Sequence, residues 1–202
     1  VKAALASRYV SEVIVSTDDE EIAAIARDAG ALTPFIRPAD LARDDTPEWL
    51  AWQHAIAWMM EKEGRQREFF LSVPATAPLR LPEDIDRCLE RLFEGDCDIV
   101  ITVCEAQRNP YFNMVTVDSK GFARLAAVPE VPVHRRQDAP SVYEITTVAY
   151  AARSCYVMEA TGLFQGKIAT VVVPRERSLD IDSPSDFALA ENAIQAGSFF
   201  TK

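Results

Sequence analysis

Apolar and polar positions follow two alternating patterns along the chain. Short continuous apolar runs, typical of buried strands, occur at residues 12–16, 69–73, 98–103, 148–151 and 168–173. Between them, apolar residues spaced three and four positions apart predict helices over residues 20–29, 47–60, 82–93 and 184–195. This alternation predicts an α/β fold, with a mostly parallel sheet and helices on both faces.

Capping residues mark the ends of two of these helices. Thr46 is placed to cap a helix that has Pro47 at its first position. Ser183 precedes Pro184 and has Asp186 three positions later, which is the pattern of a capping box. Gly197 is placed to end the last helix.

The stretch between residues 105 and 143 differs from the rest, because it is irregular and rich in Pro, Asn and Arg. We expect a single domain over residues 1–202 with this stretch as an inserted arm, and a hairpin near residues 118–121. Tyr111 and Phe112 in such a segment suggest a subunit interface, although they could also fold back onto their own core. The first residues read as the middle of an uncapped helix, so we also expect a preceding segment.

Two carboxylates follow the last apolar run. Alternate residues of an extended segment point to the same side, so Asp180 and Asp182 can face one spot at the end of a strand. A hard cation such as Mg²⁺ prefers oxygen ligands of this kind. Taken alone, however, the pattern is more typical of turn and cap chemistry.

Other polar groups follow predicted strands, where ligands of α/β sheets bind. Thr17 and Asp18 come after the first strand, either to cap the next helix or to contact a ligand. Residues 74–80 contain two prolines, small residues and Arg80, which suits a rigid loop or the wall of a pocket. Arg37 and Arg136 could each clamp a carboxylate or a phosphate, although adjacent arginines such as 135 and 136 are usually solvated.

Composition narrows the class of protein. The chain has a net charge of −10 and no long basic run, which argues against nucleic acid binding. Its four cysteines lack paired C-x-x-C spacing and its two histidines lie far apart, so neither a zinc site nor a Ser/His/Asp triad is indicated. With no signal peptide and no long apolar stretch, we expect a cytoplasmic protein that does not bind a membrane.

Taken together, several stretches resemble the N-acylneuraminate cytidylyltransferases (CMP-sialic acid synthetases) and their nonulosonate relatives. They are residues 12–23 (EVIVSTDDEEIA), 37–42 (RPADLA), 75–80 (ATAPLR), 135–138 (RRQD) and 179–187 (LDIDSPSDF). The resemblance implies a Rossmann-like nucleotidyltransferase fold and a homodimer built partly by the arm. It also implies transfer of CMP from CTP to the anomeric oxygen of a nine-carbon keto sugar, with release of pyrophosphate, for surface-glycan synthesis.

The resemblance also implies roles for individual residues. Asp180 and Asp182 would hold Mg²⁺ and be catalytic. The sugar site would include Thr76, Arg136, Gln137 and Tyr150. The nucleotide site would include Thr17, Asp18 and Arg37.

The chain departs from the family pattern in several places. The family's opening strand and basic, glycine-rich phosphate loop are missing from the sequence, and its loop glutamine is replaced at Pro74. A family lysine and a family asparagine fall at Phe112 and Thr146, which favours a more deoxygenated acceptor sugar. Two alternatives stay open: a nucleotidyltransferase for another sugar or nucleotide, and a non-catalytic homologue that binds sugar or nucleotide.

Overall fold

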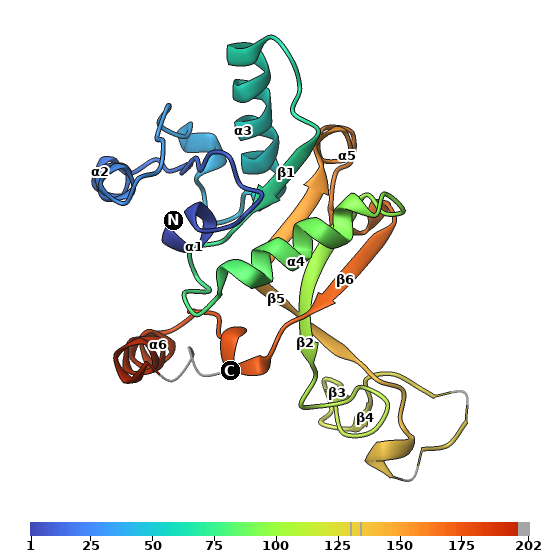
Figure 1. Ribbon diagram of the computed structural model, residues 1–202. Helices are drawn as coiled ribbons and strands as arrows, with labels where there is room; N and C mark the ends of the chain where they lie inside the picture. The colour runs from blue at the N-terminus through green and yellow to red at the C-terminus, as the bar shows by residue number, and fades with distance from the viewer. Residues whose placement is uncertain (130, 134, 198–202) are drawn as a thin grey trace.

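A four-stranded sheet organises the molecule (Figure 1). Its strands, in order across the sheet, are β1 (Phe69–Ser72), β5 (Tyr143–Arg153), β2 (Ile99–Glu105) and β6 (Ile168–Val172). Strand β2 pairs in parallel with β6, whereas β5 runs antiparallel to both β1 and β2. The computed structural model describes residues 1–129, 131–133 and 135–197. The predicted α/β fold is confirmed, with a mixed sheet in which only β5 runs against the other strands.

Helices cover both faces of the sheet, as predicted. Helix α4 (Pro82–Phe93) and the short α1 (Lys2–Leu5) pack on one face, where they bury Val100 of β2. Helix α3 (Glu48–Glu63) and α5 (Ser154–Glu159) pack on the other face, around Ile101 of the same strand. Neighbouring residues of a strand point to opposite faces, so one buried strand supplies both cores.

Helix α4 shows how spacing determines packing. Ile85, Cys88, Leu89 and Leu92 recur three and four positions apart, and all four are buried against the sheet. Burial raises the pKa of the Cys88 thiol to about 12, so this cysteine is an unreactive core residue.

Helix α6 (Pro184–Ala196) begins and ends as predicted. The Asp186 amide donates to Ser183 Oγ at 3.3 Å, and the Ser183 amide donates to Asp186 Oδ2 at 2.8 Å, which completes the capping box. Gly197 has φ of 61°, a left-handed conformation that ends the helix at little cost for glycine. Within the helix, Ala190 is buried, whereas Phe187 and Leu189 are exposed.

Two local expectations were wrong. Residues 12–16 do not form a strand of the sheet but a single bridge, because among the described residues the backbone of Val13 and Val15 hydrogen-bonds to Leu32 alone. Thr46 does not cap α3, because its hydroxyl donates to the Asp40 carbonyl at 2.9 Å and Pro47 takes the N-cap position.

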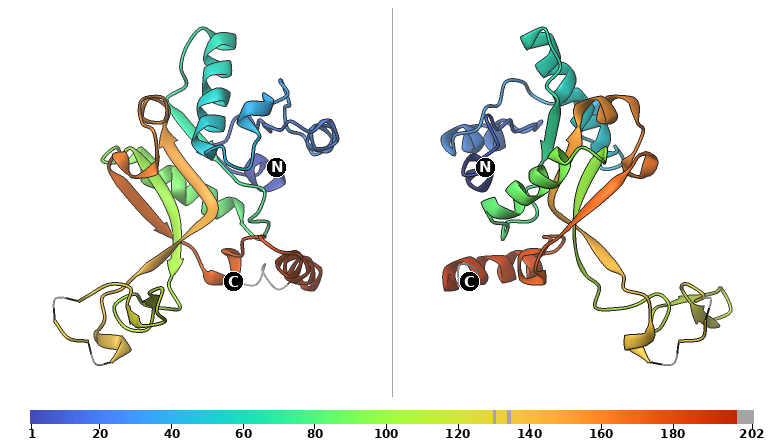
Figure 2. Two further views of the ribbon diagram at one scale, coloured as in Figure 1. Left: turned by 180° about the vertical axis from the view of Figure 1, so that it is seen from behind. Right: turned by 45° about the vertical axis from the view of Figure 1, so that its right-hand side comes forward.

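The arm (residues 105–143) leaves the end of β2 and returns at the start of β5. It contains a hairpin of β3 (Val115–Val117) and β4 (Ala123–Leu125), followed by the short helix η2 (Arg136–Asp138). Figure 2 shows that the arm projects away from the sheet and from the helices that cover it. Tyr111 and Phe112 are half-buried. The exposed apolar residues of the arm include Val115, Val117, Phe122 and Leu125 in the hairpin and Val128 and Val131 after it.

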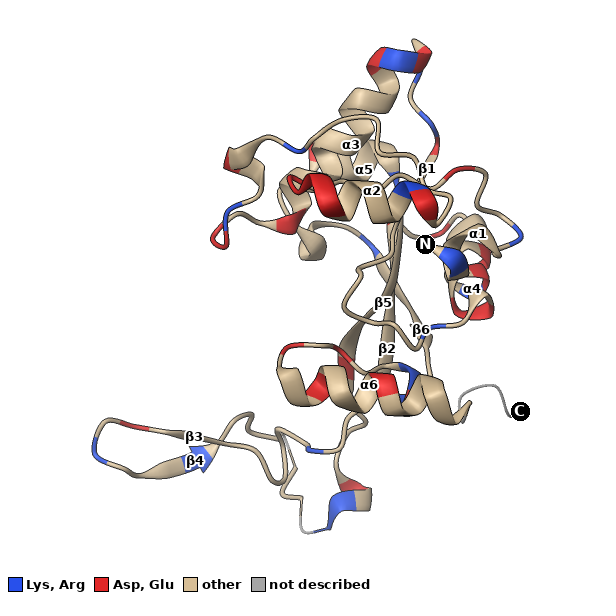
Figure 3. Cartoon of the chain, turned by 90° about the vertical axis from the view of Figure 1, so that its left-hand side faces the viewer, with Lys and Arg blue, Asp and Glu red and all other residues tan. Residues whose placement is uncertain are grey.

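The remaining elements connect these parts. They are α2 (Glu20–Asp28) and the short helices η1 (Ala39–Leu41), η3 (Leu163–Gln165) and η4 (Arg175–Arg177). Basic and acidic residues are interspersed along the chain, as the colours of the cartoon in Figure 3 show. Within the part of the chain that the structure describes, no helix is long and apolar enough to cross a membrane.

Candidate functional site

The candidate site lies at the edge of the sheet where β1, β2 and β6 end. These strands run in one direction, so the segments that follow them meet at the same edge. One hydrogen bond joins two of these segments directly, because the Ile181 amide donates to the Thr76 carbonyl at 2.9 Å. The structure therefore brings together the loop after β1 and the two-carboxylate segment after β6.

Asp180 and Asp182 have different environments within that segment. The Oδ1 atom of Asp180 is buried and has no hydrogen-bond partner among the described residues. Asp182 is exposed, and its amide donates to Asp186 Oδ2 at 3.3 Å. Burying a carboxylate oxygen without a hydrogen-bond partner costs free energy. The position of this oxygen therefore indicates that it binds a ligand or a metal ion.

Arg80 supplies the positive charge next to Asp180. Its Nη2 donates to the Pro74 carbonyl and, at 3.1 Å, to the Thr147 carbonyl, so it ties the loop after β1 to β5. Burial lowers the pKa of the Arg80 guanidinium to about 10, against the opposing charges of Asp180 and Asp84. Because this pKa stays well above neutral, Arg80 remains charged beside the carboxylate.

A second arginine fixes the chain just before Asp180. Arg177 donates through Nε at 2.8 Å and Nη2 at 2.6 Å to the fully buried Asp84 carboxylate of α4. This bidentate pair holds helix η4 against α4 and so sets the direction in which the following residues leave. Sequence reasoning missed the pair, because the two residues lie far apart in the chain.

Tyr150 lies on β5, opposite the last residue of β1. Its cross-strand partner is Ser72, and its ring packs against the Trp52 ring with centroids 5.5 Å apart. Burial, and then the negative charges of Glu48 and Asp180, raise the pKa of the Tyr150 hydroxyl. The charge of Asp180 therefore reaches the Tyr150 hydroxyl. Glu48 acts on the same hydroxyl, and sequence reasoning missed this residue. The one feature of the sequence that could have indicated it is its place in the first turn of α3.

Thr17, Asp18 and Arg37 form a separate group beside α2. The Arg37 amide donates to the Thr17 carbonyl at 2.8 Å, and Arg37 Nη2 lies 3.4 Å from Asp18 Oδ1. Asp19, rather than Thr17 or Asp18, caps α2, because its Oδ1 accepts from the amides of the second and third residues of the helix. The Nε of Arg37 is buried without a hydrogen-bond partner among the described residues.

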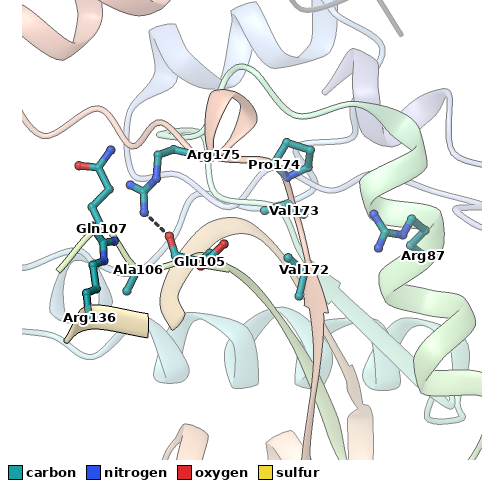
Figure 4. Close-up of a pocket in the computed structure, with 9 residues that line it drawn as sticks. All are labelled: Arg87, Glu105, Ala106, Gln107, Arg136, Val172, Val173, Pro174 and Arg175. Atoms are coloured by element: carbon teal, nitrogen blue, oxygen red, sulfur yellow. Dashed lines mark hydrogen bonds between the residues drawn. The ribbon is translucent and has the colours of Figure 1, made fainter. Parts of the chain in front are cut away.

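Arg136 and Gln137 lie in η2, at the base of the arm. Arg136 lines a cavity of about 530 Å³, together with Arg87, Glu105, Ala106, Gln107, Val172, Val173, Pro174 and Arg175. Figure 4 shows Arg136 and Gln107 on one side of this cavity and Arg87 on the other. Both arm residues also border an adjoining cavity of about 440 Å³. No hydrogen bond or ion pair within the described residues joins Arg136 to Tyr150 or Asp180.

Arg175, which lines the first cavity, pairs with Glu144. Arg175 Nη2 donates to Glu144 Oε2 at 3.0 Å and also to the Glu105 carbonyl. Burial acts to raise the pKa of the Glu144 carboxyl, but the net shift is downward. The hydrogen bond from the Gln107 amide lowers this pKa most, followed by the hydrogen bond and the charge of Arg175. This contact links the end of β2, the start of β5 and the segment after β6.

Thr146, which stands where the family has an asparagine, is buried. Its hydroxyl donates to Thr102 Oγ1 at 2.8 Å, and Thr102 Oγ1 also accepts from the Ala149 amide at 3.0 Å. This network satisfies the backbone where the pairing of β2 with β5 changes register.

The chain matches the family model described as cytidylyltransferase over residues 1–194. It belongs to the cytidylyltransferase family. Among the relatives of this family member is the CMP-N,N'-diacetyllegionaminic acid synthase of Campylobacter jejuni. It is 31% identical over 188 residues, with 93% of this chain and 79% of the relative covered.

Two further curated relatives are similar to this chain over nearly its whole length. Post-translational flagellin modification protein B of Campylobacter coli is 28% identical, with 94% of this chain and 79% of the relative covered. A pseudaminic acid cytidylyltransferase of Campylobacter jejuni is 26% identical, with 95% and 81% covered.

Solved structures show the same fold. CMP:2-keto-3-deoxy-manno-octonic acid synthetase complexed with CTP superposes with a TM-score of 0.62 and 16% identity, covering 98% of this chain and 86% of that structure. A 4-diphosphocytidyl-2C-methyl-D-erythritol synthase from Anaerococcus prevotii superposes with a TM-score of 0.64 and 15% identity, covering 96% and 82%. The cytidylyltransferase thus shares its architecture with other nucleotidyl-transferring enzymes.

Proposed function

We propose that this cytidylyltransferase transfers CMP from CTP to the anomeric oxygen of a nine-carbon keto sugar and releases pyrophosphate. The observation that carries the proposal is the family match over residues 1–194, together with relatives named for legionaminic and pseudaminic acid. The buried, unpartnered Asp180 oxygen beside charged Arg80 supports it from the side of the structure. Phosphoryl-type chemistry of this kind depends mainly on positioning and charge neutralisation.

We propose that the enzyme uses Mg²⁺, which Asp180 and Asp182 would hold. The described residues contain no group of three or more His, Cys, Asp or Glu side chains that could bind a metal ion. A two-carboxylate site still fits Mg²⁺, because this ion usually takes one or two carboxylates and completes its shell with water and substrate phosphates. When bound, it would act as a Lewis acid and template at the reacting phosphate.

The side chains around this edge have separate proposed tasks. Arg37, with Thr17 and Asp18, would orient the nucleotide. Thr76 would form the floor between nucleotide and sugar, and Tyr150 would form a wall of the sugar site. Arg136 would bind the acceptor carboxylate, because a planar guanidinium matches a carboxylate in a bidentate way. Gln137 next to it would add a neutral hydrogen-bonding group.

We also propose that the arm forms a homodimer. The side chains of Val117 and Phe122 in the hairpin are 63% and 69% exposed, and every residue of β3 and β4 is exposed. Val128, just after the hairpin, is 86% exposed. Contiguous apolar groups on a projecting hairpin indicate an interface rather than a solvated loop.

We place the reaction in the cytoplasm, because the four cysteines are free thiols, as expected in a reducing compartment.

A pyrophosphate-release screen tests the reaction. The four nucleoside triphosphates are combined with N-acetylneuraminate and with a dideoxy, diacylamino analogue, with and without Mg²⁺. We expect release only with CTP, a keto sugar and Mg²⁺, and a preference for the analogue, because Phe112 replaces a lysine of the family. Release with another nucleotide, or none with any keto sugar, would contradict the proposal.

A further inference from the structure

Glu48 is a carboxylate that the roles above leave unused. It stands in the first turn of α3, where its Oε1 accepts from the Trp52 indole at 3.1 Å and lies 3.4 Å from the Ser72 hydroxyl. These contacts fix the side chain at the end of β1. Glu48 is exposed, and among the described residues its Oε2 has no hydrogen-bond partner and the carboxylate no Lys or Arg partner. Glu48 is therefore an oriented carboxylate with one free oxygen.

The neighbours of Glu48 place its carboxylate next to residues of the candidate site. Ser72, which it contacts, is the cross-strand partner of Tyr150, and Trp52, which it also contacts, packs on the Tyr150 ring. The charges of Glu48 and Asp180 both act on the Tyr150 hydroxyl. Glu48 thus reaches the same tyrosine as the proposed metal-binding carboxylate, but from α3 rather than from the segment after β6.

We propose that Glu48 is a specificity-determining residue that accepts hydrogen bonds from substrate hydroxyl groups. The inference rests on the proposed function. An ionised carboxylate is an acceptor only, so it selects groups that donate. It also disfavours a second anion nearby, which fits a neutral, hydroxyl-bearing part of the substrate better than a phosphate. Such hydroxyls are present on the ribose of CTP and on the acceptor sugar, and an experiment can separate these two sources.

The test compares Glu48→Gln with wild type. Gln keeps an oxygen that can accept from the Trp52 indole but loses the charge and one acceptor. We expect a KM about tenfold higher for one substrate, as for a lost hydrogen bond to a charged group, with kcat and Tm close to wild type. Glu61→Gln, on the exposed far end of the same helix, is the matched control and should leave both KM values unchanged.

The two sources differ in which KM responds. If the ribose donates, the KM for CTP rises in Glu48→Gln, and 2'-deoxy-CTP loses less on the substitution than CTP does. If the acceptor donates, only the KM for the keto sugar rises. KM values within about twofold of wild type for both substrates would overturn the proposal, and so would a lowered Tm with unchanged KM values, which indicates a purely structural contact to Trp52.

Titration calorimetry separates this inference from the proposed function. CTP with Mg²⁺, and each keto sugar, are titrated into wild type, Glu48→Gln and Glu61→Gln. Wild type that binds none of them would refute the proposed function and the role of Glu48 with it. Wild type that binds them, with an unchanged Kd in Glu48→Gln, would refute the role of Glu48 alone.

Discussion

The arm (residues 105–143) and the rest of the described chain, here called the body, differ in how much of their side-chain surface is buried. In the body, β2 is buried on both faces for six successive residues, from Ile99 to Cys104, and helices cover it on each side. In the arm, every residue of the hairpin strands is exposed, and η2 has no buried residue. The body therefore has its own core, whereas the arm depends on local hydrogen bonds such as that from Asn109 Nδ2 to the Pro140 carbonyl at 2.9 Å.

This difference separates the part of the molecule that carries the core from a part that does not. Changes in the body should alter folding, the chemical step or the proposed substrate contacts of Glu48 and Tyr150, because the core, the carboxylates and these residues lie there. Changes in the arm should alter assembly or acceptor binding and leave the body folded. The following predictions test this division, from the largest expected effect to the smallest.

The largest effect is expected from Asp180→Asn, and Asp182→Asn should act in the same direction. Losing a metal-holding carboxylate should lower kcat at least ~100-fold while the chain stays folded. Pyrophosphate release at limiting Mg²⁺ measures the loss, and Glu191→Gln on α6 is the control. Turnover close to wild type in either Asp variant at limiting Mg²⁺ would refute the metal role.

The next largest effect is expected from a core substitution in the body, which should lower the free energy of unfolding. Ile85→Ala removes a fully buried side chain of α4 and should lower the free energy of unfolding by about 2–5 kcal/mol. Ile25→Ala on α2, whose side chain is 61% exposed, should change it by less than about 0.5 kcal/mol. Urea denaturation measures both, and equal losses would show that burial in the structure does not determine stability.

Arg136→Lys tests recognition by the arm. Lysine keeps the charge but loses the planar fork, so the KM for the acceptor should rise by the equivalent of about 1.5–3 kcal/mol, with little change in the KM for CTP. Arg124→Lys, an exposed position on β4, should leave both values unchanged. An acceptor KM that does not respond to Arg136→Lys would exclude the carboxylate role.

The smallest effect on folding is expected in the hairpin. Val117→Ser combined with Phe122→Ser should dissociate the dimer, while the free energy of unfolding of the separated chain changes by no more than about 0.5 kcal/mol. Light scattering at micromolar concentrations measures the mass, with Leu189→Ser on the exposed face of α6 as the control. A monomeric wild type at these concentrations would rule out the dimer.

Local patterns predicted what depends on neighbours in the sequence. The spacing of Ile85, Cys88 and Leu92 defined α4 and its buried face, and Ser183 with Asp186 defined the start of α6. These features follow from helix geometry and capping alone.

Pairing between distant segments could not be predicted in this way. The apolar run at residues 12–16 has the composition of a strand, but in the part of the chain that the structure describes it forms one bridge, to Leu32. Arg177 pairs with Asp84, and Glu48 approaches Tyr150. In both cases the two residues are about ninety or more positions apart in the sequence. Their ordinary side chains carry no local signal of the contact. The direction of β5 likewise follows from where the arm returns, not from its own residues.

The arm begins and ends at adjacent points of the sheet, because Glu105 at the end of β2 is the register partner of Tyr143 at the start of β5. A segment whose two ends meet on neighbouring strands can be lengthened, shortened or exchanged with little strain on the sheet below it. The arm is thus a replaceable module. Its length and sequence can therefore change while the strands below it keep their pairing.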